Sequence, residues 1–354
     1  MTTEAALRGY LLEEALAWLL RRGGYELLLD ESDDPVDLRW SGQGLMVRGR
    51  GADHPADTLG ELALAVPLSL PVRLFVEARF RSVVTGLPEV RNAHGVVADV
   101  NDNVGPPPGT GRAHRRHRYS YALFSTSGFS SGAQNYALAH GISLVDLSGP
   151  AFEWLRAPVQ RAAAAVLELA AHVKQEFASA HPLPQAVLRH HVRLALETTQ
   201  RPLPVTSADP VWDPVGEYLT EIAWKMGQRL VRGGDDEVLL AFPPAPFPLA
   251  MTALGPGGTN AFVAYARRNP THQVWLLHKG GRRAVAWEAV PADGSEAYRL
   301  CFNLPGHLDS WLAGSELSGD DDALSTMLIH RTAKQGTEAF RLQYSPRQRD
   351  RTRP

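Results

Sequence analysis

The sequence predicts an α/β N-terminal domain with a mixed central sheet flanked by helices, then a helical linker and a mostly β (α+β) C-terminal domain. Three observations indicate this. The first 150 residues alternate helix, strands, helix, strand, helix and strand patterns, which is typical of a layered α/β unit. Two helical patterns follow, the first rich in alanine. Beyond residue 201, short apolar runs alternate with turns containing Gly and Pro.

A length of 354 residues suits two or three domains, and the changes in pattern set their predicted limits. The predicted units are 1–150 for the α/β domain, 151–200 for the helical linker, 201–346 for the β-rich domain and 347–354 for a disordered basic tail.

The opening elements have clear local signals. Leucines at helical spacing predict an amphipathic helix over 5–22, which Gly23 and Gly24 end. Residues 25–29 have a strand pattern, and Ser41 to Gly44 predicts a hairpin within 36–49.

The clearest strand is predicted over 71–80, where apolar and β-branched residues end in charged ones. Pro88 suits the first turn of a helix over 87–101, and Ser130 or Ser131 suits the start of one over 130–140. Further strands are predicted over 58–65, 119–126 and 142–147.

The second half is predicted with long helices first and strands after them. The helices are expected over 151–176, 183–199 and 214–231. The strands are expected over 237–242, 261–266, 273–277, 284–290, 297–303 and 339–344.

The composition excludes several classes of protein. A net charge of −2 argues against coating nucleic acid by bulk charge, although a local basic patch remains compatible with it. A single cysteine excludes an intramolecular disulfide framework and a cysteine-rich zinc site. The sequence has no run of about 18 apolar residues and no secretory leader pattern, so we expect a cytoplasmic protein outside the membrane.

Three residues of the first domain suggest chemistry on phosphate. Glu77 and Arg79 are two apart on the predicted strand 71–80, so they share a face of the sheet. Asp57 precedes Glu77 by 20 positions, enough to connect neighbouring strands, whereas the competing candidate Asp37 precedes it by 40. Two converging carboxylates can hold Mg²⁺ or Mn²⁺, and a nearby guanidinium can stabilise charge developing on phosphate.

These residues belong to an ordered set of motifs. A helix contains Gly9-Tyr10-Leu11-Leu12-Glu13, Asp57 follows His54-Pro55-Ala56, and Glu77-Ala78-Arg79 ends a strand. The stretch from Phe124 to Ser130, then Gln134, Tyr136 and Ile142 to Asp146, completes the set. Residues 1–150 thereby resemble the restriction-endonuclease-like nucleases with the PD-(D/E)xK signature, in particular their Mrr-like branch.

The resemblance implies a restriction-endonuclease-like fold and a metal-dependent DNA endonuclease of bacterial restriction or antiphage defence. It assigns Asp57 and Glu77 as ligands of Mg²⁺ or Mn²⁺, Arg79 as the stabiliser of the charged transition state and Glu13 as an assisting ligand. DNA is the implied partner, with a homodimer and a partner ATPase or defence subunit as further possibilities.

A basic loop and one glutamine are predicted to contact DNA. The loop carries Arg112, Arg115, Arg116 and Arg118, which can reach phosphates, and Gln134 stands at the start of the helix over 130–140.

Arg79 departs from the family pattern, because the family has lysine at that position. The first lysine of this chain is Lys174, so the first domain contains no substitute. An arginine keeps the charge but cannot act as a base. A second hypothesis is therefore a weakened or inactive DNA- or partner-binding subunit on the same fold. A third is a protein-interaction scaffold in which residues 201–354 do the work.

Overall fold

The computed structural model describes most of the chain. The described residues are 3–41, 44–63, 68–104, 116–149, 152–177, 185–197, 201, 216–244, 249–280, 285–304, 324–333 and 336–344. Within them the chain is an α+β protein with several sheets, including a closed seven-stranded barrel formed by its C-terminal part.

A five-stranded mixed sheet organises the N-terminal part, as the sequence predicts. Its strands, in spatial order, are β1 (Tyr25–Leu28), β5 (Thr58–Leu62), β6 (Val72–Arg79), β7 (Arg118–Ser125) and β8 (Ser143–Asp146). β1 and β5 run antiparallel to their neighbours, whereas β6, β7 and β8 run parallel to one another. The carboxyl ends of β6, β7 and β8 therefore meet at one edge.

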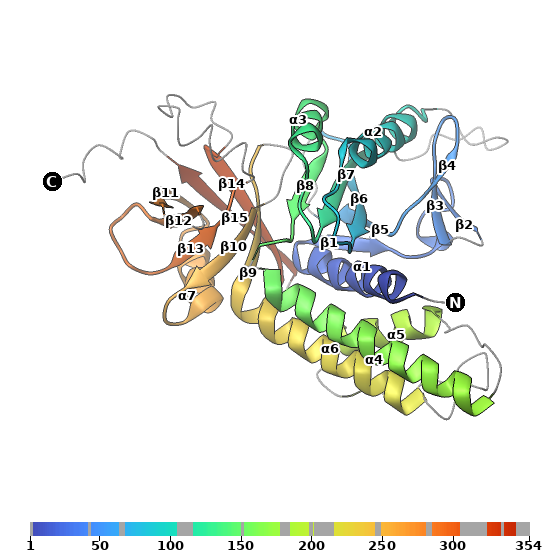
Figure 1. The fold of residues 1–354 in the computed structure, drawn as a ribbon. Helices are drawn as coiled ribbons and strands as arrows, with labels where there is room; N and C mark the ends of the chain where they lie inside the picture. Colours follow the sequence, from blue (N-terminus) through green and yellow to red (C-terminus); the bar gives the residue numbers. More distant parts are fainter. Residues whose placement is uncertain are drawn as a thin grey trace.

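Helices cover both faces of this sheet (Figure 1). On one face lie α2 (Leu87–Asn101) and α3 (Ser131–His140), whose apolar residues pack with Phe75 and Leu123. On the other lies α1 (Glu4–Arg22), packed against Leu74 and Val76. Alternate residues of β6 thus belong to two different cores, since successive side chains of a strand point to opposite faces.

A separate three-stranded sheet follows β1 along the chain. It contains β2 (Leu38–Ser41), β3 (Gly44–Arg48) and β4 (Asp53–Pro55), preceded by the short 3₁₀ helix η1 (Glu31–Asp33). The strand β4 is absent from the sequence prediction, in which 50–57 is a loop. Asp99 of α2 anchors this sheet: it accepts hydrogen bonds from the Gly51 and Ala52 amides and contacts His54 at 2.8 Å.

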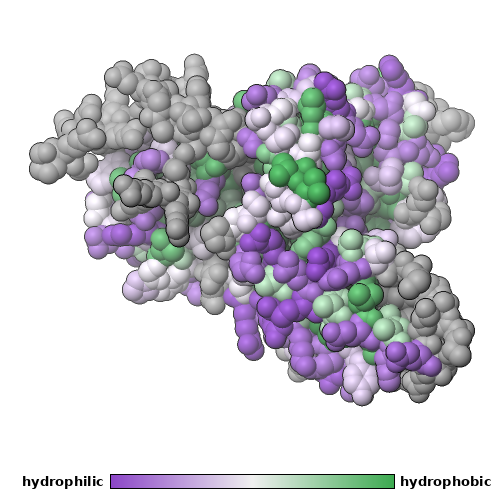
Figure 2. Space-filling model, in the orientation of Figure 1, coloured by the Kyte–Doolittle hydropathy of each residue, from purple (hydrophilic) through white to green (hydrophobic). Residues whose placement is uncertain are grey.

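Three helices form a further layer beneath α1 (Figure 1). They are α4 (Glu153–Phe177), α5 (Gln185–Glu197) and α6 (Gly216–Glu237). Buried residues of all three share one apolar core with α1, including Val159, Val192 and Ala223. The outer face of α4 and α6 is mainly hydrophilic in Figure 2, so these helices bury one side and expose the other. None of the described helices is both long and apolar enough to cross a membrane.

The barrel follows α6 directly. Its strands are β9 (Val238–Phe242), β10 (Leu249–Leu254), β11 (Thr271–Gly280), β12 (Val285–Pro291), β13 (Arg299–Phe302), β14 (Thr326–Ala333) and β15 (Gly336–Tyr344). Pairing is antiparallel except between β11 and β15, and Phe262, Trp287 and Met327 are among the residues that fill the barrel core. The sequence prediction omits β10 and β14.

The predicted strand over 261–266 is wrong, because these residues lie in α7 (Gly258–Arg268). Phe262, Val263, Tyr265 and Ala266 are buried, which is the spacing of one helix face rather than the alternation of a strand. Gly257 precedes the helix at a φ of 86°, a conformation that glycine adopts without strain.

Candidate active site at the end of β6

The register of β5 and β6 brings Asp57 and Glu77 together. Thr58 pairs with Val76 in this antiparallel ladder, so the position before β5 lies across from Glu77. Residues directly opposite in an antiparallel pair have Cβ atoms about 5 Å apart and share a face. Asp57 and Glu77 therefore converge from adjacent strands, although 20 positions separate them in the chain.

Glu77 is buried and has two partners. Its side chain accepts a hydrogen bond of 2.6 Å from the Tyr121 hydroxyl at Oε2 and forms an ion pair with Arg79 at Oε1. Tyr121 comes from β7, the parallel neighbour of β6. Burial raises the pKa of Tyr121 and the nearby Asp57 charge raises it further, so the phenol stays protonated and can donate to Glu77. This contact fixes the orientation of the carboxylate.

Arg79 lies two residues after Glu77 on the same face, as its spacing predicts, and its side chain is half-buried. Its Nε is buried and has no hydrogen-bond partner among the described residues. A buried donor without a partner costs free energy, so this N–H favours an acceptor such as a phosphate oxygen.

Asp57 stands at the solvent-exposed edge of the cluster. The surrounding protein atoms raise its pKa above the usual value, while the Arg79 charge and the Ala78 amide, which donates to its carboxylate, lower it. The net pKa shift is upward. A cation bound beside Asp57 would lower this pKa and favour the ionised carboxylate.

Glu13 of α1 lies within electrostatic reach of the same cluster. Burial raises its pKa to about 8, with the Asp57 charge next in importance, while Arg189 and Arg79 oppose the shift. Glu13 thus lies within electrostatic reach of Asp57 and Arg79.

Two arginines of α5 hold the acidic pair of α1. Arg189 donates to Glu13 Oε2 at 2.7 Å and to Glu14 Oε1 at 2.6 Å, and Arg193 donates to Glu14 at 2.9 Å. Glu14 is 1% exposed, and a buried carboxylate needs such donors. Arg189 also interacts electrostatically with Asp57, so α5 places a second positively charged side chain near the site.

Of the predicted DNA-contact residues that the structure describes, the two arginines lie away from this site. Arg112 and Arg115 lie outside the described residues. Arg118 begins β7 level with Val72 of β6, so it lies about 17 Å along the strands from the level of Glu77. Arg116 is exposed and adjacent to that same far end. Only Gln134 lies near the carboxyl ends of the strands, and its amide donates to the Phe129 carbonyl at 2.9 Å.

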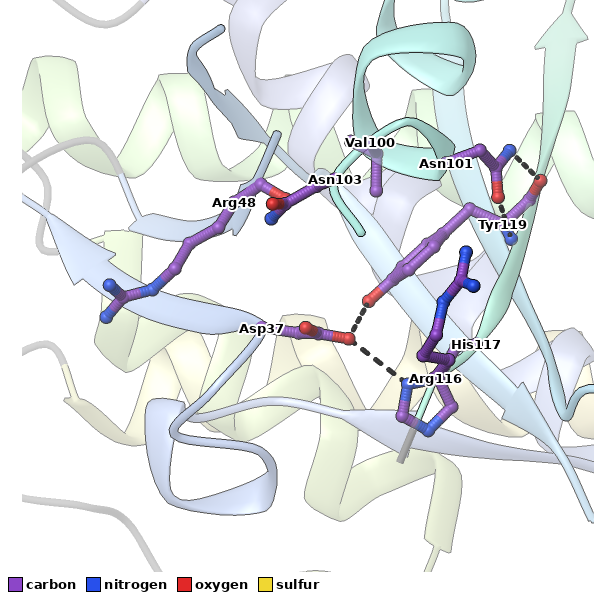
Figure 3. Close-up of a pocket in the computed structure, with 8 residues that line it drawn as sticks. All are labelled: Asp37, Arg48, Val100, Asn101, Asn103, Arg116, His117 and Tyr119. Carbon is purple, nitrogen blue, oxygen red and sulfur yellow. Dashed lines mark hydrogen bonds and ion pairs between the residues drawn. The ribbon is translucent and has the colours of Figure 1, made fainter. Parts of the chain in front are cut away.

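Asp37, the competing motif aspartate, belongs to a different cluster. Its Oδ2 accepts from the Tyr119 hydroxyl at 2.9 Å and lies 3.1 Å from His117 Nδ1 (Figure 3). It also contacts Arg73, which lies four residues before Glu77 on β6, or about 13 Å along the strand. The geometry therefore favours Asp57 over Asp37 as the partner of Glu77.

The donor set suits a hard divalent cation. Mg²⁺ typically binds proteins through one or two carboxylates and keeps several water ligands. Exposed Asp57 and buried Glu77 could supply two such carboxylates. A cation would share Glu77 with Arg79, which already pairs with it. Within the described part of the chain, the three-residue group close enough to hold a metal is Asp34, Asp37 and His117, and Glu13 does not complete such a group with Asp57 and Glu77.

Sequence reasoning missed Tyr121, Glu14, Arg189 and Arg193. One signal was available: two adjacent glutamates inside an apolar stretch of a helix predict a basic partner, since buried carboxylates need one. The sequence does not show which arginines pair with these glutamates, because the pairing depends on how α5 packs against α1.

Comparison with known proteins identifies no family for this chain. No protein-family model matches it, and no curated protein sequence matches it. Among solved structures it aligns with one titled "Crystal Structure of Protein of Unknown Function AF1548", at 17% identity and a TM-score of 0.28. That alignment covers 64% of this chain and 96% of the other.

Proposed function

We propose that this chain is a metal-dependent DNA endonuclease with a restriction-endonuclease-like N-terminal domain, acting in bacterial restriction or antiphage defence. One observation carries the proposal: the β5–β6 register puts Asp57 across from Glu77, with Arg79 on the same face. The order of helix, strands and crossover helices around them is compatible with that fold.

Each residue has a separate task in the proposed reaction. Asp57 and Glu77 would hold Mg²⁺ or Mn²⁺, and Tyr121 would keep Glu77 oriented. The bound ion would neutralise phosphate charge and acidify a water molecule. Arg79 would donate from its unpartnered Nε to a phosphate oxygen, where negative charge grows as the phosphodiester breaks.

Glu13 is proposed to assist at the side of the site. Arg79 cannot accept a proton from the attacking water, because its guanidinium stays charged. Glu13 can accept one when ionised, and Arg189 favours that ionised form by donating to its carboxylate. The remaining partners, a second copy of the chain and an ATPase or defence subunit, are proposed from the family resemblance alone.

The second candidate function is a DNA- or partner-binding subunit without catalysis. The ion pair between Arg79 and Glu77 favours it, since this pair compensates the charge that a metal ion would otherwise neutralise. Metal binding discriminates between the two: an active nuclease needs an ion at Asp57 and Glu77, whereas an inactive subunit does not.

Plasmid cleavage tests the proposal. The wild type should nick or linearise plasmid DNA in Mg²⁺ or Mn²⁺, and Glu77→Gln should abolish this while DNA binding persists. Asp102→Asn is the matched control, because Asp102 is an exposed carboxylate that pairs with Arg50 at 3.6 Å and should leave the rate unchanged. Equal cleavage by wild type and Glu77→Gln would refute the assignment.

A further inference from the structure

A second polar cluster lies at the opposite end of β6. Arg73, Phe75 and Glu77 are alternate residues of one strand, and buried Phe75 separates the two charged positions. Around Arg73 the chain gathers acidic residues from the loop after η1 and from the end of β5. A cavity of about 480 Å³ opens beside them, and its lining includes Asp34, Glu61, Arg73 and His117.

Negative charge exceeds positive charge in this cluster. Arg73, 3% exposed, donates to Asp34 at 2.7 Å and to Glu61 at 3.0 Å, and lies 3.3 Å from Asp37. One guanidinium therefore faces three carboxylates. The carboxylates thus outnumber the guanidinium, a condition that favours a further cation.

His117 is buried among these carboxylates and has one nitrogen without a hydrogen-bond partner. Its Nδ1 lies 3.1 Å from Asp37 Oδ2 and 3.9 Å from Asp34 Oδ2. Its Nε2 is buried without a hydrogen bond, 3.5 Å from Glu61 Oε2. When a neutral imidazole carries its proton on Nδ1 and donates it to Asp37, the lone pair on Nε2 faces Glu61.

We propose that Asp34, Asp37 and His117 form a binding site for a divalent transition-metal ion, Zn²⁺ above all. One ligand atom from each residue lies within 4.8 Å of the others, close enough for small side-chain movements to reach bonding distance. An ion on Nδ1 moves the imidazole proton to Nε2, which can then donate to Glu61. This produces the carboxylate–histidine–metal arrangement common in metal sites.

The proposed ion differs in kind from the one at Asp57 and Glu77. An imidazole ligand favours Zn²⁺ over Mg²⁺, whereas a carboxylate-only pair suits Mg²⁺. The cavity gives the ion a path from solvent. The inference does not rest on the proposed nuclease function, and either can fail without the other.

Calorimetric titration of the full, EDTA-treated protein with ZnCl₂ tests the site. The wild type should bind one Zn²⁺, and His117→Gln should weaken binding by at least tenfold. Glu61→Gln should weaken it by about tenfold, as loss of an outer hydrogen-bond partner does. His54→Gln is the matched control, because His54 also contacts an aspartate, Asp99 at 2.8 Å, and should bind Zn²⁺ like the wild type.

A second measurement keeps the proposal testable if His117→Gln fails to fold. X-ray absorption of the Zn²⁺-loaded wild type should show one imidazole nitrogen among oxygen ligands. Absence of Zn²⁺ binding to the wild type, a coordination shell without imidazole, or equal affinity in a folded His117→Gln would overturn the proposal.

Discussion

The ion pair between Arg79 and Glu77 is the residue-scale feature on which activity depends. A guanidinium is planar, always charged and able to bind two oxygens of a phosphate, whereas an ammonium is compact. In the free protein Arg79 forms an ion pair with Glu77, although its Nε has no hydrogen-bond partner among the described residues. Binding of DNA and a metal ion would have to redistribute these contacts.

Two substitutions of Arg79 should distinguish the effect of its positive charge from that of its guanidinium shape. Arg79→Lys, which restores the family's residue, should retain or raise the initial cleavage rate in Mg²⁺, because the compact ammonium keeps the positive charge and can also lie near a water molecule. Arg79→Ala should lower the rate by about 10²–10³, the loss typical of one electrostatic donor in a transition state. Rates are compared at matched DNA occupancy. Equal rates for the wild type and Arg79→Ala would exclude a catalytic role.

The raised pKa of Glu13 should appear as a pH dependence of stability. With a pKa raised from 4.5 to about 8, the native state holds a proton that the unfolded state has lost in that range. The free energy of unfolding of metal-free protein should therefore fall as pH rises from about 4.5 to 8.

In Glu13→Gln this fall should be smaller, because glutamine does not titrate. Urea unfolding at about pH 4.5 and pH 8 measures this fall in the free energy of unfolding. Glu4→Gln on the same helix serves as a control, since Glu4 is only partly buried and pairs with Arg8. A pH dependence identical in the wild type and Glu13→Gln would show that the Glu13 carboxyl titrates normally.

At the scale of elements, α5 supplies the arginines that pair with buried carboxylates of α1. Its two arginines at i and i+4 face the acidic pair of α1, and their guanidinium groups satisfy a carboxylate that is almost wholly buried. The segment predicted as a helical linker thus supplies charge to the region of the candidate site.

Loss of Arg189 should cost stability as well as activity. Arg189→Gln should lower the free energy of unfolding by about 1.5–3 kcal/mol, the usual range for hydrogen bonds to charged groups. Arg201→Gln should cost less than about 1 kcal/mol, because the contacts of Arg201 with Glu217 and Glu221 are largely exposed. Chemical denaturation measures both, and equal losses would contradict a specific role for α5.

Local patterns predicted the N-terminal elements well and the barrel less well. The strand β6 and helix α2 have strong signals, a β-branched apolar run and a proline in the first helical turn. The strand prediction over 261–266 failed because an apolar run of six is compatible with either a strand or a helix. Packing against the barrel core selects the helix.

At the scale of the whole molecule, one sheet carries two polar clusters at opposite ends of β6. The spacing of Glu77 and Arg79 predicted the first, because residues two apart share a face whatever the rest of the fold does. The second could not be predicted, since Asp34, Arg73 and His117 meet only through strand pairing and loop closure across more than 80 positions. Arg189 escaped prediction for the same reason.

The barrel packs against the rest of the molecule at the end of α1. Tyr25 and Phe242 have ring centroids 6.5 Å apart, and Leu240 of β9 joins the core shared by α1 and α6. The site at Asp57 and Glu77 forms from the N-terminal sheet alone, with Glu13 and Arg189 added from the helices.

The most direct test of the central claim compares two aspartates. The strand register makes Asp57 the partner of Glu77, whereas Asp37 belongs to the cluster around Arg73. Initial plasmid-cleavage rates in Mg²⁺, normalised to folded protein and DNA bound, should fall at least about 10²-fold in Asp57→Asn and stay within a few-fold of wild type in Asp37→Asn. Unchanged cleavage by Asp57→Asn, or a loss confined to Asp37→Asn, would contradict the account.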